Sequence, residues 1–120
     1  MSPATTLADS RDATRAVAAR MRPHARSAAA LLRALSNEQR LLILCHLSEG
    51  ERSVGELNDR LPLSQSALSQ HLAVLREGGV VATRREGQSV LYSLADGPAA
   101  RVVGTLHDIY CGSGKRTRSR

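Results

Sequence analysis

The chain has 120 residues, enough for one domain with one hydrophobic core. It contains two tyrosines but no Phe or Trp, so the core must be built from Leu, Val, Ile and Ala. The net charge of +6 favours a nucleic acid or another anionic partner, and the short apolar runs at residues 28–32 and 41–45 exclude a membrane-spanning helix.

Residues 1–23 are rich in Ala, Thr, Arg and Ser and show only weak periodicity. We therefore expect a flexible N-terminal arm that is disordered or partly helical. The segment lacks the charged start and apolar stretch of a signal peptide, and two cysteines do not form a secretory disulfide framework. These features indicate a cytoplasmic protein without a membrane partner, whose folded domain spans residues 24–111.

The domain should begin with two helices. Residues 24–35 form the first, with an apolar stripe at Ala28, Leu31, Leu32 and Leu35. Ser36 and Gln39 have the spacing of a capping box, which predicts the start of a second helix that ends at Gly50. The two helices carry more apolar surface than a three-helix core needs, so we expect one of them to line a dimer interface.

Residues 53–77 read as two helices separated by a break. Ser53 and Glu56 form a capping box for the first helix, and Pro62 ends it. Ser64 is an N-cap for the second helix, which stops at the glycines 78 and 79. The buried stripe of this second helix is expected at Ala67, Leu68, Leu72 and Leu75.

The outward face of the second helix carries polar side chains and no acidic one. A solvated helix face normally carries Glu and Lys, whereas a face that reads base edges needs donors and acceptors without negative charge. We therefore predict a helix-turn-helix whose second helix enters the DNA major groove. The candidate DNA-reading residues are Ser64, Gln65, Ser66, Ser69, Gln70 and His71.

Two strand-like runs follow, at residues 80–85 and 89–94, joined by a turn at residues 86–88. Arg84 and Arg85 lie beside this turn, where we expect them to contact the DNA backbone or minor groove. The alternative is a helical pair and a β-hairpin with an ordinary polar surface, but the order of helix, turn, helix and basic hairpin favours a DNA-binding unit.

The chain should end with one more helix, opened by Asp96 and Pro98. Its broad apolar face must be covered by another part of the protein or by a second chain. The residues of this face are Val102, Val103, Leu106, Ile109 and Tyr110. Residues 112–120 are expected to be a flexible basic tail.

The stretch from residue 64 to 94 reads SQSALSQHLAVLREGGVVATRREGQSVLYSL and resembles the winged helix-turn-helix of the ArsR/SmtB family of bacterial regulators. The preceding segment, ALSNEQRLLILCHLSEGERSVGEL, resembles the entry helices of that family. The resemblance implies a mainly α-helical fold with a small β-hairpin wing. It also implies a homodimer built by the first and last helices, and ligand-controlled binding to double-stranded operator DNA.

Cys45 and Cys111 resemble the cysteine pair of the sulfide- and persulfide-responsive branch of this family, the BigR and SqrR type. That resemblance implies a repressor, not an enzyme, that uses no cofactor or metal. Reactive sulfur species would be its inducer, and the two thiols would join through a persulfide, polysulfide or disulfide.

Four alternatives stay open. His107 and Cys111 are four residues apart and could share a soft metal, although two further ligands would be needed. The HlyU type of regulator has the same cysteine placement and suggests an activator. The thiols also fit a bystander role or a small thiol enzyme, but the chain has no Cys-x-x-Cys motif.

Overall fold

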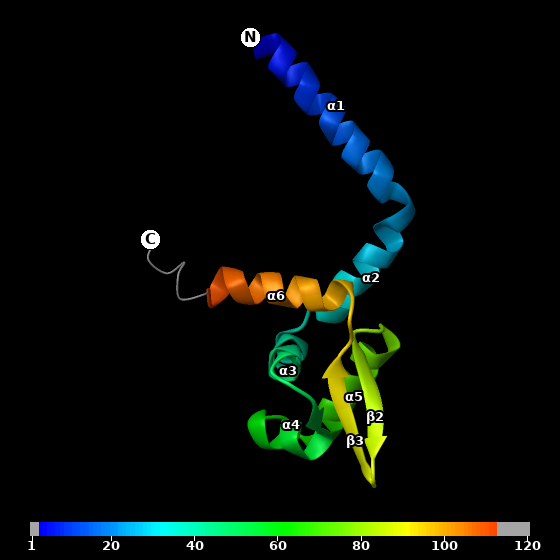
Figure 1. Cartoon of the computed structure of the whole chain (residues 1–120), viewed down its shortest axis with the longest axis vertical. Coiled ribbons are helices and arrows are strands. Elements are labelled where there is room, and N and C mark those ends of the chain that lie inside the picture. Colours follow the sequence, from blue (N-terminus) through cyan, green and yellow to red (C-terminus); the bar gives the residue numbers. More distant parts are fainter. Residues whose placement is uncertain (1–2, 113–120) are drawn as a thin grey trace. The chain divides into compact units, whose positions relative to one another are not determined.

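The computed structural model describes residues 3–112, with side chains from residue 11 onward (Figure 1). The chain divides into two units, residues 1–30 and 31–120. The first unit contains α1 (Pro3–Met21), the short 3-10 helix η1 (Arg22–His24) and the first part of α2 (Ala25–Leu35). Within the described part of the chain, no helix is both long enough and apolar enough to cross a membrane.

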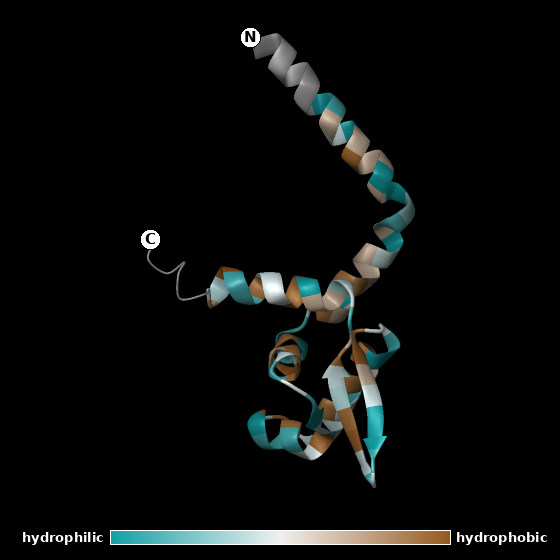
Figure 2. Ribbon diagram, in the orientation of Figure 1, coloured by the Kyte–Doolittle hydropathy of each residue, from teal (hydrophilic) through white to brown (hydrophobic). Residues whose placement is uncertain are grey.

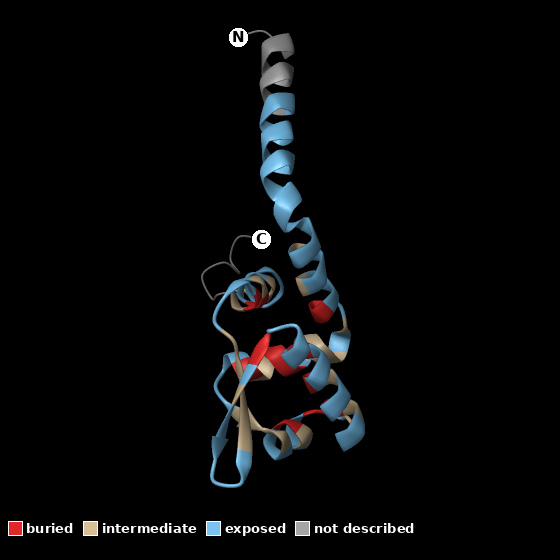
Figure 3. Cartoon of the chain, turned by 90° about the vertical axis from the view of Figure 1, so that its right-hand side faces the viewer, coloured by how far each residue is buried: buried red, intermediate tan, exposed pale blue. Residues whose placement is uncertain are grey.

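The N-terminal arm expected from the sequence contains the continuous helix α1. Alanine and arginine are strong helix formers, which accounts for a helix where the apolar periodicity is weak. Side chains 11–27 are all exposed, and Figure 3 shows α1 exposed along its described length. From residue 11 onward the helix is therefore supported by local propensity and not by burial. The basic tail expected at 112–120 lies outside the described residues, apart from Gly112.

The second unit is the mainly α-helical domain that the sequence predicts. After the end of α2 come α3 (Glu38–Ser48), α4 (Val54–Arg60) and α5 (Gln65–Glu77), and α6 (Pro98–Tyr110) ends the fold. Strands β2 (Val81–Glu86) and β3 (Ser89–Leu94) form the expected antiparallel hairpin after α5. The winged helix-turn-helix prediction is confirmed.

The sheet has a third strand that the sequence does not reveal. Strand β1 (Arg52–Ser53) pairs antiparallel with β3, so the strand order is β1-β3-β2. Two residues are too few to show the alternation of apolar and polar side chains by which a strand is recognised. Strand β1 ties the segment between α3 and α4 to the wing.

The hydrophobic core joins the helices to the base of the wing. Leu57 of α4 and Leu68 and Leu75 of α5 are fully buried. The remaining core side chains come from α2, α3, the α4–α5 turn, α5, the segment before β2, β2 itself and α6. They are Ala34, Leu35, Ile43, Leu44, Leu47, Leu61, Leu72, Val80, Val81, Ala99 and Val103. Ala67, expected in the buried stripe of α5, is only half-buried. The aliphatic core predicted from composition is confirmed.

Two predicted helix starts are confirmed. Ser53 Oγ accepts a hydrogen bond from Glu56 N at 3.1 Å, and Ser53 N donates to Glu56 Oε1 at 2.8 Å. This capping box holds the pKa of Glu56 below its ordinary value, chiefly through the backbone hydrogen bond from Ser53. Ser64 Oγ accepts from Ala67 N at 3.1 Å and begins α5. Helix α4 ends at Arg60, before Pro62 as expected.

Two other predicted starts are wrong. Asn37, not Ser36, caps α3, because Asn37 Oδ1 accepts from Arg40 N at 3.0 Å and residue 37 has the extended backbone of an N-cap. Gly97, not Asp96, precedes α6, and no side chain caps that helix. Gly97 has a φ of 132°, which disfavours any side chain, while Pro98 occupies the first turn as expected.

The wing turn is tighter than predicted. Glu86 pairs with Ser89, so the loop contains only Gly87 and Gln88. Gly87 has a φ of 63°, and a positive φ at the first loop residue matches the right-handed twist of the two strands. In Figure 2 the end of β2 near this turn is hydrophilic.

We predict that Leu57→Ala lowers the free energy of unfolding by about 2–5 kcal/mol, because it leaves a cavity between α4 and α5. Val74→Ala on α5 is the matched control; its side chain is 40% exposed and its loss should stay below about 1 kcal/mol. Urea unfolding at a fixed protein concentration measures both. Equal losses would contradict the assigned core.

Candidate nucleic-acid interface

The turn between α4 and α5 is held by a side chain as well as by Pro62. Asn58 Nδ2 donates to the carbonyl oxygen of Leu63 at 2.8 Å. Leu61 is buried in the core at the end of α4. The burial of Leu61 before Pro62 and the hydrogen bond to Leu63 after it therefore fix the angle between α4 and α5.

The exposed face of α5 is uncharged and polar over its first two turns. Gln65, Ser66, Ser69 and Gln70 are all exposed. The hydroxyl of Ser64 already accepts a hydrogen bond as the helix cap, so it has less capacity for another partner than the sequence prediction assumed. Glu77, the only carboxylate of α5, is its last residue. The face therefore presents donors and acceptors to an anionic partner without repulsion.

His71 lies differently from the other predicted reading residues. It is half-buried, and its Nδ1 lies 3.5 Å from Nη1 of Arg40 on α3. The same guanidinium donates through Nε to the carbonyl of Ala34 at 2.6 Å and through Nη2 to that of Arg33 at 3.1 Å. Arg40 thus connects the C-terminal end of α2 with the side of α5.

The two wing arginines have different surroundings. Arg84 makes a bidentate ion pair with Glu51: Nε to Oε2 and Nη2 to Oε1 are both 2.7 Å. This contact holds the pKa of Glu51 below its ordinary value and raises that of Arg84. Arg85 is the next residue of the strand, so its side chain projects from the opposite face of the hairpin, where it is exposed.

Cys45 lies on α3, and Cys111 is the residue that follows α6. Cys45 lines a cavity of about 520 Å³ with the α3 C-cap Glu49 and with residues of α3, β3 and α6, among them His107 and Asp108. Burial raises the pKa of the Cys45 thiol, and the nearby charges of Cys111 and Glu49 raise it further. Cys111 is exposed at the end of α6, and both thiols are free.

The metal alternative would use side chains at the end of α6. His107 and Asp108 face the same cavity as Cys45. Nevertheless, no group of three or more His, Cys, Asp or Glu side chains in the described residues is placed to hold a metal ion.

Three side chains of this region were not expected from the sequence: Arg40, Glu51 and Asn58. Arg40 and Glu51 act on partners 31 and 33 residues away, so no local pattern indicates them. Asn58 acts over five residues, and a polar residue before a proline turn was the only available signal.

Residues 37–83 match the model of the bacterial regulatory protein family named arsR. The chain is 52% identical over 91 residues to the transcriptional activator HlyU of Vibrio cholerae, covering 76% of this chain and 84% of that protein. The solved reduced form of HlyU from V. cholerae N16961 superposes with a TM-score of 0.72, at 51% identity, over 77% of this chain and 97% of its own.

Two further proteins are similar to this chain over most of its length. The biofilm growth-associated repressor of Agrobacterium fabrum is 46% identical over 76% of this chain and 78% of its own length. The homodimeric winged helix-turn-helix domain Mb0332 of Mycobacterium bovis, described as a possible ArsR-family regulator, has a TM-score of 0.68 at 30% identity, over 77% of this chain and 85% of its own.

We predict that the Glu51 carboxyl titrates below the ordinary range of a glutamate, because the Arg84 guanidinium favours its charged form. The ion pair is therefore present at neutral pH and is lost as the pH falls through the lowered folded-state pKa. A carbon-detected NMR titration should show the Glu51 midpoint rise in Arg84→Ala and stay unchanged in Arg85→Ala. The ion pair is wrong if Arg84→Ala leaves the midpoint where it was.

Proposed function

Because the chain belongs to the arsR family of bacterial regulatory proteins, we propose that it is a homodimeric repressor that binds operator DNA. In this proposal the protein releases the DNA when it reacts with sulfur species. The observation that carries the DNA-binding part is the exposed, uncharged polar face of α5, whose opposite face is anchored in the core. A helix of this kind fits the major groove with its N-terminal residues against base edges.

The reading residues we propose are Gln65, Ser66, Ser69 and Gln70, with Ser64 and His71 at the margins of the face. Glutamine reads adenine through paired hydrogen bonds, and serine accepts or donates at any base edge. The N-terminal turn of α5 also carries unpaired backbone N–H groups and no acid, which favours a nearby phosphate.

On the wing we assign the phosphate contact to Arg85. Its guanidinium is exposed, whereas that of Arg84 is occupied by the carboxylate of Glu51. A carboxylate and a phosphate offer an arginine the same bidentate acceptor geometry, so Arg84 can bind DNA only by exchanging one partner for the other.

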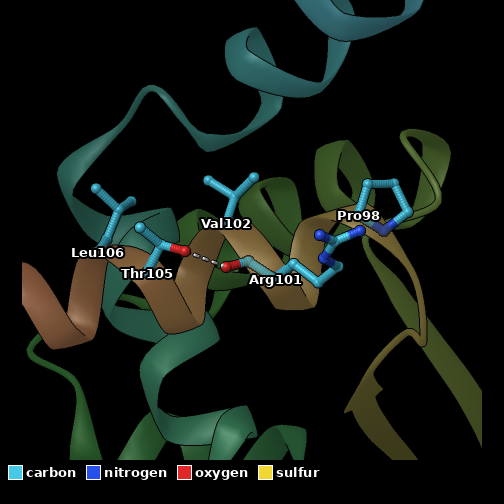
Figure 4. Close-up of a pocket in the computed structure, with 5 residues that line it drawn as sticks. All are labelled: Pro98, Arg101, Val102, Thr105 and Leu106. Carbon is cyan, nitrogen blue, oxygen red and sulfur yellow. Dashed lines mark hydrogen bonds between the residues drawn. The ribbon is translucent and has the colours of Figure 1, made fainter.

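The homodimer is supported by apolar surface that a single chain leaves uncovered. Val102 and Leu106 of α6 line a shallow hollow of about 390 Å³, and Figure 4 shows both pointing to the same side of the helix. Beyond them Ile109 and Tyr110 are 61% and 82% exposed. We propose that a second copy covers this face, in the manner of the homodimeric relative from M. bovis.

The proposed switch uses both cysteines and an organic persulfide, RSSH. The Cys111 thiolate attacks the terminal sulfur of RSSH, forms a protein persulfide and expels RS⁻. Cys45 then attacks Sγ of Cys111 and expels HS⁻, which leaves a disulfide between α3 and α6. Two thiols are oxidised, and the persulfide is reduced to RSH and H₂S.

The order of attack follows from the surroundings of the two thiols. Cys111 is exposed, whereas burial raises the pKa of the half-buried Cys45 and so lowers its thiolate fraction. Cys111 is therefore the first nucleophile and Cys45 the resolving one. A bridge between them would tie α3, which packs on α5, to α6, which carries the proposed dimer face.

A second candidate function is activation, as in the relative HlyU, a transcriptional activator. The biofilm growth-associated repressor of A. fabrum favours the opposite sign. The same DNA-binding surface serves both, since an activator can act by displacing another DNA-bound protein. Expression of a reporter behind the bound site, with and without the protein, separates the two.

We predict that Arg85→Ala weakens binding to all duplexes alike and lowers the salt slope by about one counterion. Arg84→Ala is the matched control and should change the slope less, because Glu51 holds that side chain. Gln70→Ala should instead cost about 1–3 kcal/mol at particular base pairs. Fluorescence anisotropy with duplexes selected from a random pool measures all three. If Gln70→Ala left base preference intact and Arg85→Ala altered it, the assignment of α5 and the wing would be reversed.

We predict that an organic persulfide makes each chain lighter by two hydrogen atoms, links Cys45 to Cys111 within one subunit, and releases DNA. Cys45→Ser should stop at a persulfide on Cys111, whereas Cys111→Ser should react slowly because Cys45 is shielded. Intact-mass spectrometry and anisotropy follow both events. The switch would be disproved by a Cys45→Ser, Cys111→Ser double variant that still released DNA on the same treatment.

A further inference from the structure

Arg40 occupies an unusual position between three helices. Its backbone N–H completes the cap of α3 by donating to Asn37 at 3.0 Å. Its side chain reaches back to the carbonyls of Arg33 and Ala34, at 3.1 and 2.6 Å. Both carbonyls belong to the last turn of α2, where backbone acceptors have no partner within the helix. Arg40 is therefore anchored at two points before it meets His71.

The contact with His71 favours one tautomer of the imidazole ring. Nη1 of Arg40 lies 3.5 Å from Nδ1 of His71. A guanidinium has donors only, so in a hydrogen bond between these two atoms Nη1 donates and Nδ1 accepts. An imidazole that accepts at Nδ1 is neutral and carries its proton on Nε2. The ring geometry points Nε2–H away from Arg40, and among residues 11–112 the structure gives it no hydrogen-bond partner.

We propose that Arg40 is a positioning residue that fixes His71 as an Nε2–H donor, so that α5 discriminates against cytosine at the base pair beside this ring. In the major groove, purine N7, guanine O6 and thymine O4 accept a hydrogen bond, whereas the cytosine amino group donates one and meets the donor unfavourably. This inference rests on the proposed role of α5 as the reading helix.

The first test needs no DNA. In the free protein, at a pH where the imidazole is neutral, the ring ¹⁵N shifts of His71 should report a proton on Nε2 and a hydrogen-bonded Nδ1. His71→Gln assigns these signals by their loss. Arg40→Met should shift the Nδ1 signal, and Arg33→Met, which removes an exposed arginine side chain from α2, should leave it unchanged. A wild-type ring protonated on Nδ1 would overturn the proposal.

The second test measures base preference. Single-position variants of a selected duplex should show one position at which cytosine lowers the affinity of the wild type by about two- to tenfold, the range of one hydrogen bond. Arg40→Met and His71→Gln should each abolish that discrimination, and the double variant should add nothing. If Arg40→Met instead weakens every duplex equally and keeps the discrimination, Arg40 serves only the fold and the proposal fails.

Arg40→Lys covers the case in which Arg40→Met does not fold. It keeps the charge but gathers its donors on one nitrogen, and the Nδ1 shift of His71 reports whether the contact is lost. Loss of the contact together with the discrimination supports the proposal, and loss of the contact with the discrimination retained contradicts it. The two tests also separate the two inferences. If the His71 ring shows the expected ¹⁵N shifts but the wild type has no base preference, the reading role of α5 is refuted. If the wild type has a clear base preference but the His71 ring lacks the expected shifts, only the role of Arg40 is refuted.

Discussion

The burial of α5 against α3 and α4 is the constraint on which the rest of the domain depends. Leu57, Leu68 and Leu75 are fully buried, and Leu72 is nearly so. Because three of these leucines recur along one side of α5, the helix cannot rotate without exposing them, which would cost several kcal/mol. The same constraint fixes which residues of α5 face solvent, so the exposed polar face that we propose reads DNA is a direct result of the apolar core.

Two polar contacts between residues distant in the sequence add to the arrangement that the hydrophobic core determines. Glu51 and Arg84 connect the segment before α4 to the wing, where β1 already pairs with β3. This ion pair is exposed and adds little to stability, but it decides which wing arginine is available to an anion. We propose a corresponding effect of Arg40 on α5, in which it selects the form of His71 that meets a partner.

Features encoded within a few residues were predictable from the sequence. The capping residues Ser53 and Ser64, the break at Pro62 and the hairpin all follow from local rules, and the structure has them. The cap at Asn37 was missed because Ser36 fits the same rule one residue earlier. The partners of Arg84 and His71 were not predictable, because each lies more than thirty residues away and no period in the sequence relates the two positions.

The central claim, that DNA binds to the exposed face of α5 and to the wing, is tested most directly by NMR. A duplex selected by the protein from a random pool is added to isotope-labelled protein, and the side-chain amide signals of Gln65, Gln70 and Gln88 are followed with the backbone amides. The account predicts that the largest shifts fall on α5 and the β2–β3 hairpin, with small ones on α6. Shifts concentrated on α6, with the amides of Gln65 and Gln70 unchanged, would contradict it.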